Sequence, residues 1–342
     1  MSYGVVQTPR VYIDNVLFAR AIGMPLRVTT GPAELWDFDP IRTKNFSTSE
    51  TKVQSELTFD SEFHNGFSSI LETSNYFAIL NHNLASGGDE RINLNGDSLA
   101  YNGNYDQTVY NSSGTITIED NKVGTLSGDI TTDGFALAEI SLSSSYNQFT
   151  QFDFLFDTPE SQCNYNIGCY SLGTYLDFPF SPDLEVKAQY SHEGVSSKRT
   201  VAGKDITHVS YYGAPNWGDL PPFTETNTNN EGVYFAGAGL TGRKSWDMKF
   251  SYVDKTDMFN QFQYGSSAGT HSLSGDNYIL SEEQSILGTY LSRTLGGKLK
   301  HILQPDNTKN EFYLVKLNQK SININQVAPG VFEISLKFVQ VW

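Results

Sequence analysis

The stretch Val331-Phe-Glu-Ile-Ser-Leu-Lys-Phe-Val339 alternates apolar and polar residues along its whole length. This period of two is typical of a β-strand with one face buried and the other in solvent. Upstream, Trp246-Asp-Met-Lys-Phe-Ser-Tyr252 repeats the pattern, with an apolar residue at every second position. Residues 312–317 and 321–325 add two shorter strand-like runs. We therefore expect the C-terminal hundred residues to form a sheet.

One helix is expected between these strands, over residues 281–295. Ser281 and Gln284 have the spacing of a capping box, and the tandem Gly296-Gly297 supplies a stop. Glu282 and Glu283 suit the positive end of the helix dipole. The apolar residues of the segment fall on one stripe: Ile286, Leu287, Tyr290, Leu291 and Leu295. This stripe predicts that the helix packs on the sheet.

Composition favours many short strands. The 342 residues include 13% aromatic and only 18% charged residues. β-Propensity is highest for aromatic and β-branched residues, so a mainly β chain is expected, long enough for two domains.

The chain before residue 178 is predicted to form a jelly-roll or β-sandwich domain. Phe77-Ala-Ile-Leu80 indicates a buried strand, and residues 135–140 and 151–156 continue the strand pattern. Residues 11–14 and 16–18 indicate one or two early strands, and residues 35–40 the rim of a sheet.

Two prolines interrupt Asp177-Phe-Pro-Phe-Ser-Pro-Asp183, which suggests a domain boundary. We expect a sandwich domain over residues 1–178 and a sheet domain with one packed helix over residues 179–342. Residues 96–128 are rich in Asn, Ser and Gly, so a surface hairpin or long loop is expected there, with one strand at 115–118.

Charge argues against a nucleic-acid binder. The net charge is −15 and no basic run offsets it, so sequence-specific nucleic-acid binding is not expected. No apolar stretch of about 18 residues indicates a membrane span, and no secretory signal is visible. Cys163 and Cys169 are expected to be reduced thiols if the protein assembles in the cytoplasm, although a disulfide between them is an alternative.

Two glycine motifs match catalytic or cofactor signatures by letter. Gly237-Ala-Gly-Leu-Thr-Gly242 matches the dinucleotide fingerprint, but a strand-like segment follows where a helix is needed. Gly265-Ser-Ser-Ala-Gly269 matches the nucleophile elbow around Ser267, with His271 nearby, but more loop follows. We interpret both motifs as loops.

Carboxylate pairs are the remaining chemical candidates. Asp37 and Asp39 would share one face of a strand and could bind calcium, although a solvated strand edge is the simpler interpretation. Asp89 and Glu90 form another pair, and His82 ends a buried strand without an indicated partner. We predict no catalytic residues, no cofactor and no metal ligands, and therefore not an enzyme.

Three tyrosines lie among Asn and Gly in the polar loop: Tyr101, Tyr105 and Tyr110. Aromatic rings flanked by amides are typical of sugar-binding surfaces, because a ring packs on the C–H face of a sugar. These tyrosines are candidate glycan contacts; an irregular loop pinned by its own side chains is the alternative.

Six segments of the C-terminal half carry a family likeness: Ser171–Leu184, Gly242–Tyr252, Leu295–Asn307, Asn310–Leu314, Gln326–Leu336 and Trp342. Through them the chain resembles tail-tip or minor tail proteins of tailed bacteriophages. The resemblance covers about residues 170–342, and it departs at Lys300-His301, where the family pattern has Pro-Phe. Residues Phe77–Ser86 have a weaker likeness to the central strand of a discoidin-like, galactose-binding-type sandwich.

The resemblance implies a structural virion protein assembled in the host cytoplasm. Copies would form a ring, a hexamer or trimer, at the distal end of the tail tube. The ring would join the tube to the hub, tip or fibres, as a distal tail or baseplate component. The alternatives are a carbohydrate-binding adhesin that contacts host glycans and, in a third class, an envelope-degrading hydrolase.

Overall fold

The computed structural model describes residues 7–23, 26–30, 32–40, 42, 44–46, 52–59, 74–82, 91–98, 107–108, 119–120, 135–139, 149–157, 165–184, 186–191, 195–209, 243–254, 257, 285–308 and 312–341. The protein is mainly β, and its strands pair in antiparallel sheets, which confirms the predicted fold class at this level.

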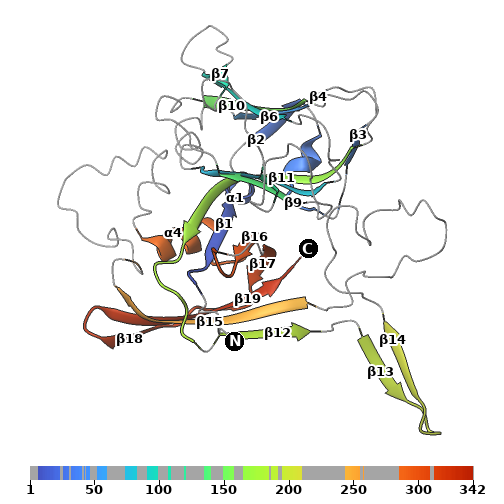
Figure 1. Cartoon of the computed structure of the whole chain (residues 1–342), viewed down its shortest axis with the longest axis vertical. Helices are drawn as coiled ribbons and strands as arrows, with labels where there is room; N and C mark the ends of the chain where they lie inside the picture. Colours follow the sequence, from blue (N-terminus) through green and yellow to red (C-terminus); the bar gives the residue numbers. More distant parts are fainter. Residues whose placement is uncertain are drawn as a thin grey trace.

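A twelve-stranded sheet forms the body of the molecule (Figure 1). Its strands, in spatial order, are β12 (Lys187–Ser191), β15 (Arg243–Asp254), β19 (Val331–Gln340), β17 (Tyr313–Leu317), β16 (His301–Gln304), β1 (Arg10–Asp14), β11 (Tyr165–Asp177), β5 (Tyr76–His82), β9 (Phe135–Glu139) and β8 (Glu119–Asp120). Off this path, β18 (Ile324–Ala328) pairs with β19, and β3 (Lys44–Phe46) pairs with β11.

Two smaller sheets complete the β structure of the described residues. A five-stranded sheet lies over the β11–β5–β9 end of the large sheet (Figure 1). Its strands are β2 (Leu26–Thr30), β4 (Lys52–Phe59), β10 (Phe149–Asp157), β6 (Arg91–Ser98) and β7 (Gln107–Thr108). β13 (Val195–Arg199) and β14 (Asp205–Val209) form a separate hairpin. The helical elements among the described residues are α1 (Asn15–Ala21), the 3₁₀ helix η1 (Ala33–Trp36) and α4 (Ile286–Arg293).

Strand β1 joins the two halves of the chain. It pairs with β11 on one side and with β16, nearly 300 residues later in sequence, on the other. Val11 and Ile13 enter one apolar cluster and Tyr12 another, so β1 is buried on both faces. The sheet therefore runs across the boundary expected at residues 178–179. The division into domains 1–178 and 179–342 stays a prediction, as does the sandwich topology of the first.

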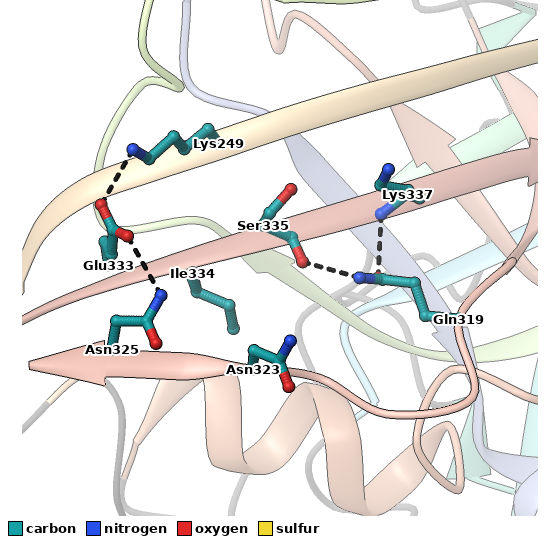
Figure 2. Close-up of a pocket in the computed structure, with 8 residues that line it drawn as sticks. All are labelled: Lys249, Gln319, Asn323, Asn325, Glu333, Ile334, Ser335 and Lys337. Carbon is teal, nitrogen blue, oxygen red and sulfur yellow. Dashed lines mark hydrogen bonds and ion pairs between the residues drawn. The ribbon is translucent and has the colours of Figure 1, made fainter.

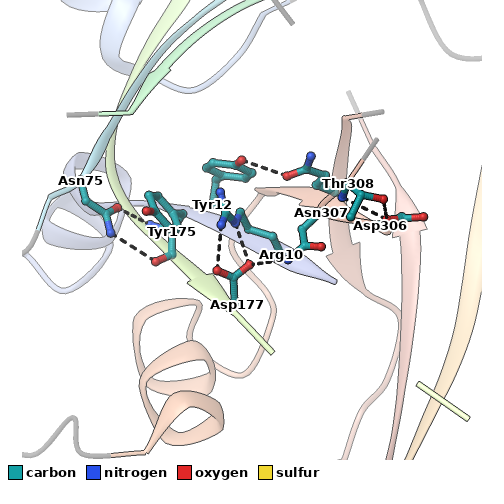
Figure 3. A network of polar contacts seen from close by, with 9 residues as sticks. Arg10, Tyr12, Asn75, Tyr175, Asp177, Asp306, Asn307 and Thr308 are labelled. Atoms are coloured by element: carbon teal, nitrogen blue, oxygen red, sulfur yellow. Dashed lines mark hydrogen bonds and ion pairs between the residues drawn. The ribbon is translucent and has the colours of Figure 1, made fainter. Parts of the chain in front are cut away.

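Polar contacts fix the outer end of β1 (Figure 3). The Arg10 guanidinium donates two hydrogen bonds to the Asp177 carboxylate, at 2.7 Å from Nε and 2.8 Å from Nη2. Arg10 also lies 4.2 Å from the centre of the Tyr175 ring, and Asn307 Nδ2 donates to Asp177 at 3.3 Å. A bidentate arginine–carboxylate pair fixes geometry as well as charge. These contacts set the register of β1, β11 and the chain after β16.

The expected helix is α4, which packs on the core of the C-terminal strands, but it begins and ends at other residues than expected. Ser285, not Ser281, is the N-cap: its Oγ accepts from Gly288 N at 3.0 Å. Residues 281–284 lie outside the described residues. Leu287 and Tyr290 are buried against β15 and β19 residues, as predicted, but Leu295 is 41% exposed because it adopts a positive φ of 51° after the helix has ended. Gly296 and Gly297 continue the positive-φ stop with φ of 67° and 75°.

The other C-terminal predictions hold with one correction in β15. The expected strands correspond to β15, β17 and β19, and β18 begins three residues later than expected. A bulge between Phe250 and Val253 interrupts the alternation of β15. Val253 is consequently buried, and Tyr252, which the pattern placed on the apolar face, is 78% exposed.

In the N-terminal part, the strands expected at 77–80, 135–140 and 151–156 correspond to β5, β9 and β10. Residues 16–18 are helical rather than extended, because Asp14 caps α1 by accepting a hydrogen bond from Leu17 N. Residues 35–40 form no sheet rim: Leu35, Trp36 and Phe38 are all buried, which the turn of η1 allows and a strand would not. The strand expected at 115–118 lies outside the described residues.

Candidate assembly surface

The outer face of β12, β15 and β19 carries a ladder of charges opposite the apolar core. Register places Lys187 beside Asp247 and Asp247 beside Lys337. Lys337 Nζ lies 3.1 Å from Asp247 Oδ2, and Ser335 Oγ donates to Asp247 Oδ1 at 2.9 Å. Each strand alternates, so the Trp246 and Phe338 side chains point into the core from the same strands. The outer face of these strands is therefore polar, while their other face packs in the core.

A second charged row lies toward β18 (Figure 2). Lys249 Nζ is 2.8 Å from Glu333 Oε2, and Asn325 Nδ2 donates to Glu333 Oε1 at 3.1 Å. The hydrogen bond from Lys249, with that from Asn325, lowers the pKa of Glu333. Such exposed pairs contribute little to stability, so their effect is mainly to fix which charges this face presents.

Gln319 lies between β17 and β18, which pair with different parts of the same edge of β19. Its Nε2 donates to Ser335 O at 3.0 Å and its Oε1 accepts from Lys337 N at 3.0 Å (Figure 2). The side-chain amide therefore bonds the β19 backbone as a neighbouring strand would.

Two shallow hollows lie on this polar face. One, of about 230 Å³, lies among Lys249, Gln319, Asn325 and Glu333; the other, of about 190 Å³, lies between β12 and β19. The charged groups that line the first are already paired, Lys249 with Glu333 and Lys337 with Asp247. Neither hollow brings together a nucleophile, a base and a buried charge, which is the arrangement that a catalytic site needs.

Strand β12 forms one end of the twelve-stranded sheet and is exposed along its whole length. Tyr190, 56% exposed, lies near the Lys244 ammonium, which also donates to Tyr313 Oη at 2.7 Å. Although burial lowers the pKa of Lys244, hydrogen bonds with Tyr313 and Tyr190 raise it overall. Lys244 is thus a fixed cation between two tyrosine rings at the open edge.

The β13–β14 hairpin, hereafter the arm, projects from the β12 end of the sheet (Figure 1). Val195 pairs with Val209 and Arg199 with Asp205, and Gly203, with φ of 85°, closes the tip. Thr200 is half-buried, and the other residues from 196 to 208 are exposed. Neither face of the arm is therefore covered by the rest of the described chain.

Asp37 and Asp39 do not form the expected pair on one strand face. Asp37 lies 2.6 Å from Arg20 Nη1, whereas Asp39 lies 3.7 Å from Arg42 and 3.8 Å from Lys300. The buried Phe38, with φ of 53°, separates the two carboxylates. Each aspartate is bonded to cations of its own, which removes the reason for a calcium site here.

The other predicted sites fall mostly on residues that the structure leaves undescribed. These are the candidate glycan contacts Tyr101, Tyr105 and Tyr110, both glycine motifs with Ser267 and His271, the pairs Asp89/Glu90 and Glu282/Glu283, and Cys163. His82 ends β5 opposite Ile167, and its side chain is likewise outside the description. Cys169 is a buried free thiol, and burial raises its pKa well above the usual value.

Among the described residues, no three His, Cys, Asp or Glu side chains are grouped so that they could hold a metal ion. The helices of the described part are too short or too polar to span a bilayer. The exposed edge and the arm are the features of the described chain most suited to contact another molecule. Comparison with models of protein families, with curated proteins and with solved structures finds no match to this chain.

Proposed function

We propose that this chain is a non-enzymatic structural subunit that assembles with copies of itself, as a ring component of a bacteriophage tail. The observation that carries the proposal is the exposed strand β12 at one end of a twelve-stranded sheet. An edge strand presents unpaired backbone groups, which proteins cover or protect to prevent uncontrolled pairing. A closed ring of subunits covers such edges.

The surface around β12 suits a specific contact. Its charges are fixed in the Lys187–Asp247–Lys337 and Lys249–Glu333 rows, so the surface presents a defined pattern of charge. Charge patterns of this kind select register and partner more than they add affinity. The assignment to a phage tail rests on the sequence resemblance over residues 170–342, which also supports a ring of three or six copies in the virion.

The experiment blocks the β12 edge with a charge. Ala188 is exposed in β12, and a lysine on an edge strand is a device by which natural proteins prevent pairing. We expect Ala188→Lys to lower the assembled fraction of the full chain in size-exclusion chromatography with light scattering. Ala33→Lys is the matched control, because Ala33 is also exposed but lies in η1, which packs against β11.

Unchanged assembly of Ala188→Lys, with a thermal unfolding midpoint equal to that of the control, would exclude β12 as the contact. A wild-type chain that stays monomeric over the whole concentration range would contradict the proposed function itself.

A further inference from the structure

The arm carries charge opposite in sign to the rest of the chain. The arm has three cationic residues and one anionic residue: Lys198, Arg199, Lys204 and Asp205. Residues 195–209 therefore have a net charge of +2 with His208 neutral, whereas the whole chain has a net charge of −15. Ile206 is 54% exposed, and Val201 at the tip is fully exposed. The arm thus combines cations with apolar side chains that face no other part of the described chain.

A hairpin of this kind needs a cover. Two antiparallel strands alone are marginally stable in water, and they become stable with a third strand or an apolar surface to pack on. The neighbouring strand β12 pairs with β15 through residues 187–191, and among the described residues no third strand pairs with the arm. Another molecule can supply the surface that the arm lacks within the described part of the chain.

At the far end of β15, exposed apolar side chains gather into what we call the end patch. It consists of Leu184, Tyr252 and Val327, exposed by 90%, 78% and 49%. Three sets of contacts bring them together. Asp183 accepts hydrogen bonds from Ser251, Asp254 pairs with Val331 of β19, and Val331 pairs with Ala328 of β18.

Tyr252 in the end patch has an unusual backbone. Its φ is 65°, and the bulge before Val253 turns its ring out of the core. A positive φ is costly for a bulky residue, and such strain concentrates at functional positions. Tyrosine is also enriched at the centre of protein interfaces.

The end patch is acidic as well as apolar. Asp254 lies in it, and Lys255 and Asp257 follow in the chain, so residues 254–257 carry a net charge of −1. The two carboxylates are close enough that burial and the Asp254 charge raise the pKa of Asp257. The arm, with a net charge of +2, is opposite in sign to this segment.

Arm and end patch lie at opposite ends of β15. Ser191, just before the arm, pairs with Arg243 at the start of β15, whereas the end patch surrounds its last residues (Figure 1). The 12 residues of β15 span about 40 Å at the rise of a strand. The arm therefore cannot reach the patch of its own chain, but it can reach that of another copy.

We propose that the arm of one copy docks on the end patch of the next, so that this chain associates head to tail. This inference rests on the proposed function and adds a second contact to the one proposed at β12. A contact between two different surfaces of identical chains is heterologous, and it closes into a ring when the rotation per subunit divides a full turn. The cationic arm selects the acidic patch, and Val201 and Ile206 cover its apolar side chains.

The test reverses the arm charge in the full-length chain. Lys198→Glu with Lys204→Glu changes the arm from basic to acidic. We expect the concentration at half-assembly, measured by mass photometry, to rise roughly tenfold or more, because facing like charges at an interface cost several kcal/mol. Lys44→Glu with Lys320→Glu is the control, because it changes the net charge equally at two exposed lysines outside the arm and the end patch.

A second variant makes the test specific. Adding Asp254→Lys and Asp257→Lys to the arm reversal exchanges the two charges, and this quadruple variant should recover assembly. If the arm reversal assembles like its control, or if the exchange restores nothing, the arm–patch contact is wrong while ring assembly through β12 stands. If the wild-type chain itself never assembles, both proposals fail together.

Discussion

His301 lies fully buried in β16, between the Tyr290 hydroxyl and the Leu299 carbonyl. The carbonyl can only accept, so Nδ1 donates to Leu299 O at 2.9 Å and Nε2 accepts from Tyr290 Oη at 3.0 Å. The ring also packs edge-on against Tyr290 and Phe338. His301 thus lies in the core as a neutral aromatic residue, at the position where the sequence resemblance leads us to expect phenylalanine.

Burial lowers the pKa of His301 to about 4, with a further contribution from the Lys316 charge. The unfolded chain binds a proton near pH 6.5 and the folded chain only near pH 4, so stability falls as the pH falls through this window. His301→Phe, which cannot titrate, should be less stable than wild type at pH 7 by about 1–3 kcal/mol, because Tyr290 Oη and Leu299 O lose their partner. Between pH 7 and pH 4 the difference should change by about 3 kcal/mol in favour of the variant, which removes or reverses it, as the shift in pKa requires.

Urea unfolding at pH 7, 6, 5 and 4 measures this difference. Asp14 acts in the opposite sense, since burial raises its pKa to about 6 and folding then favours its protonated form as the pH falls. Comparing the variant with wild type cancels that effect. A difference that stays constant with pH would show that His301 is not buried in its neutral form.

Gly173 marks the closest approach between β11 and β1. A Cβ at this position would lie 1.8 Å from Ile13 O, a backbone atom of a strand buried on both faces. Gly173→Ala should therefore destabilise the protein by about 3 kcal/mol or more, at the upper end of overpacking costs. Gly330→Ala is the control, because its Cβ meets nothing within 4 Å and only its φ of 74° is unfavourable. Equal thermal midpoints for the two variants would contradict this packing.

At the scale of the element, α4 depends on its first turn. Ser285 is 2% exposed, and its hydroxyl accepts from Gly288 N. Ser285→Ala should cost about 1 kcal/mol, the usual value of an N-cap. Ser292→Ala, inside the same helix, should change stability by only about a few tenths of a kcal/mol. Thermal unfolding would refute this assignment of the cap if Ser292→Ala were the more damaging change.

Elements with a clear period could be predicted from the sequence, and departures from the period could not. β19 follows the alternation of Val331–Val339, and α4 follows its apolar stripe. The bulge in β15 gives no signal in Trp246–Tyr252, because Tyr252 and Val253 are both acceptable core residues and tertiary packing decides between them. By contrast, Asp14 followed by a short apolar segment is a cap signal that could have revealed α1.

The candidate site was harder to predict than the fold. Sequence patterns identify motifs with chemistry, such as Gly237–Gly242, whereas an assembly surface depends on which strand ends the sheet. β12 is an edge only because β15 pairs with it on one side and the chain then leaves the sheet to form the arm. The end patch likewise gathers residues 184, 252 and 327 from three segments. Long-range pairing of this kind is not encoded in local periodicity.

At the scale of the whole molecule, one sheet extends through both halves of the chain. β1 connects the N-terminal strands to the C-terminal ones and contributes side chains to both apolar clusters. The sheet ends at β12, and the arm begins there. A sheet fixed at its centre and open at its edge is suited to growth by adding neighbouring subunits.

The central claim is that copies of this chain assemble, and the mass of the purified full-length protein tests it most directly. The monomer mass is 38.1 kDa. Native mass spectrometry should show a closed species of several copies, three or six if the tail-ring proposal holds, that gives ring-shaped particles in negative stain. A species of 38.1 kDa at every concentration, without larger particles, would contradict the account.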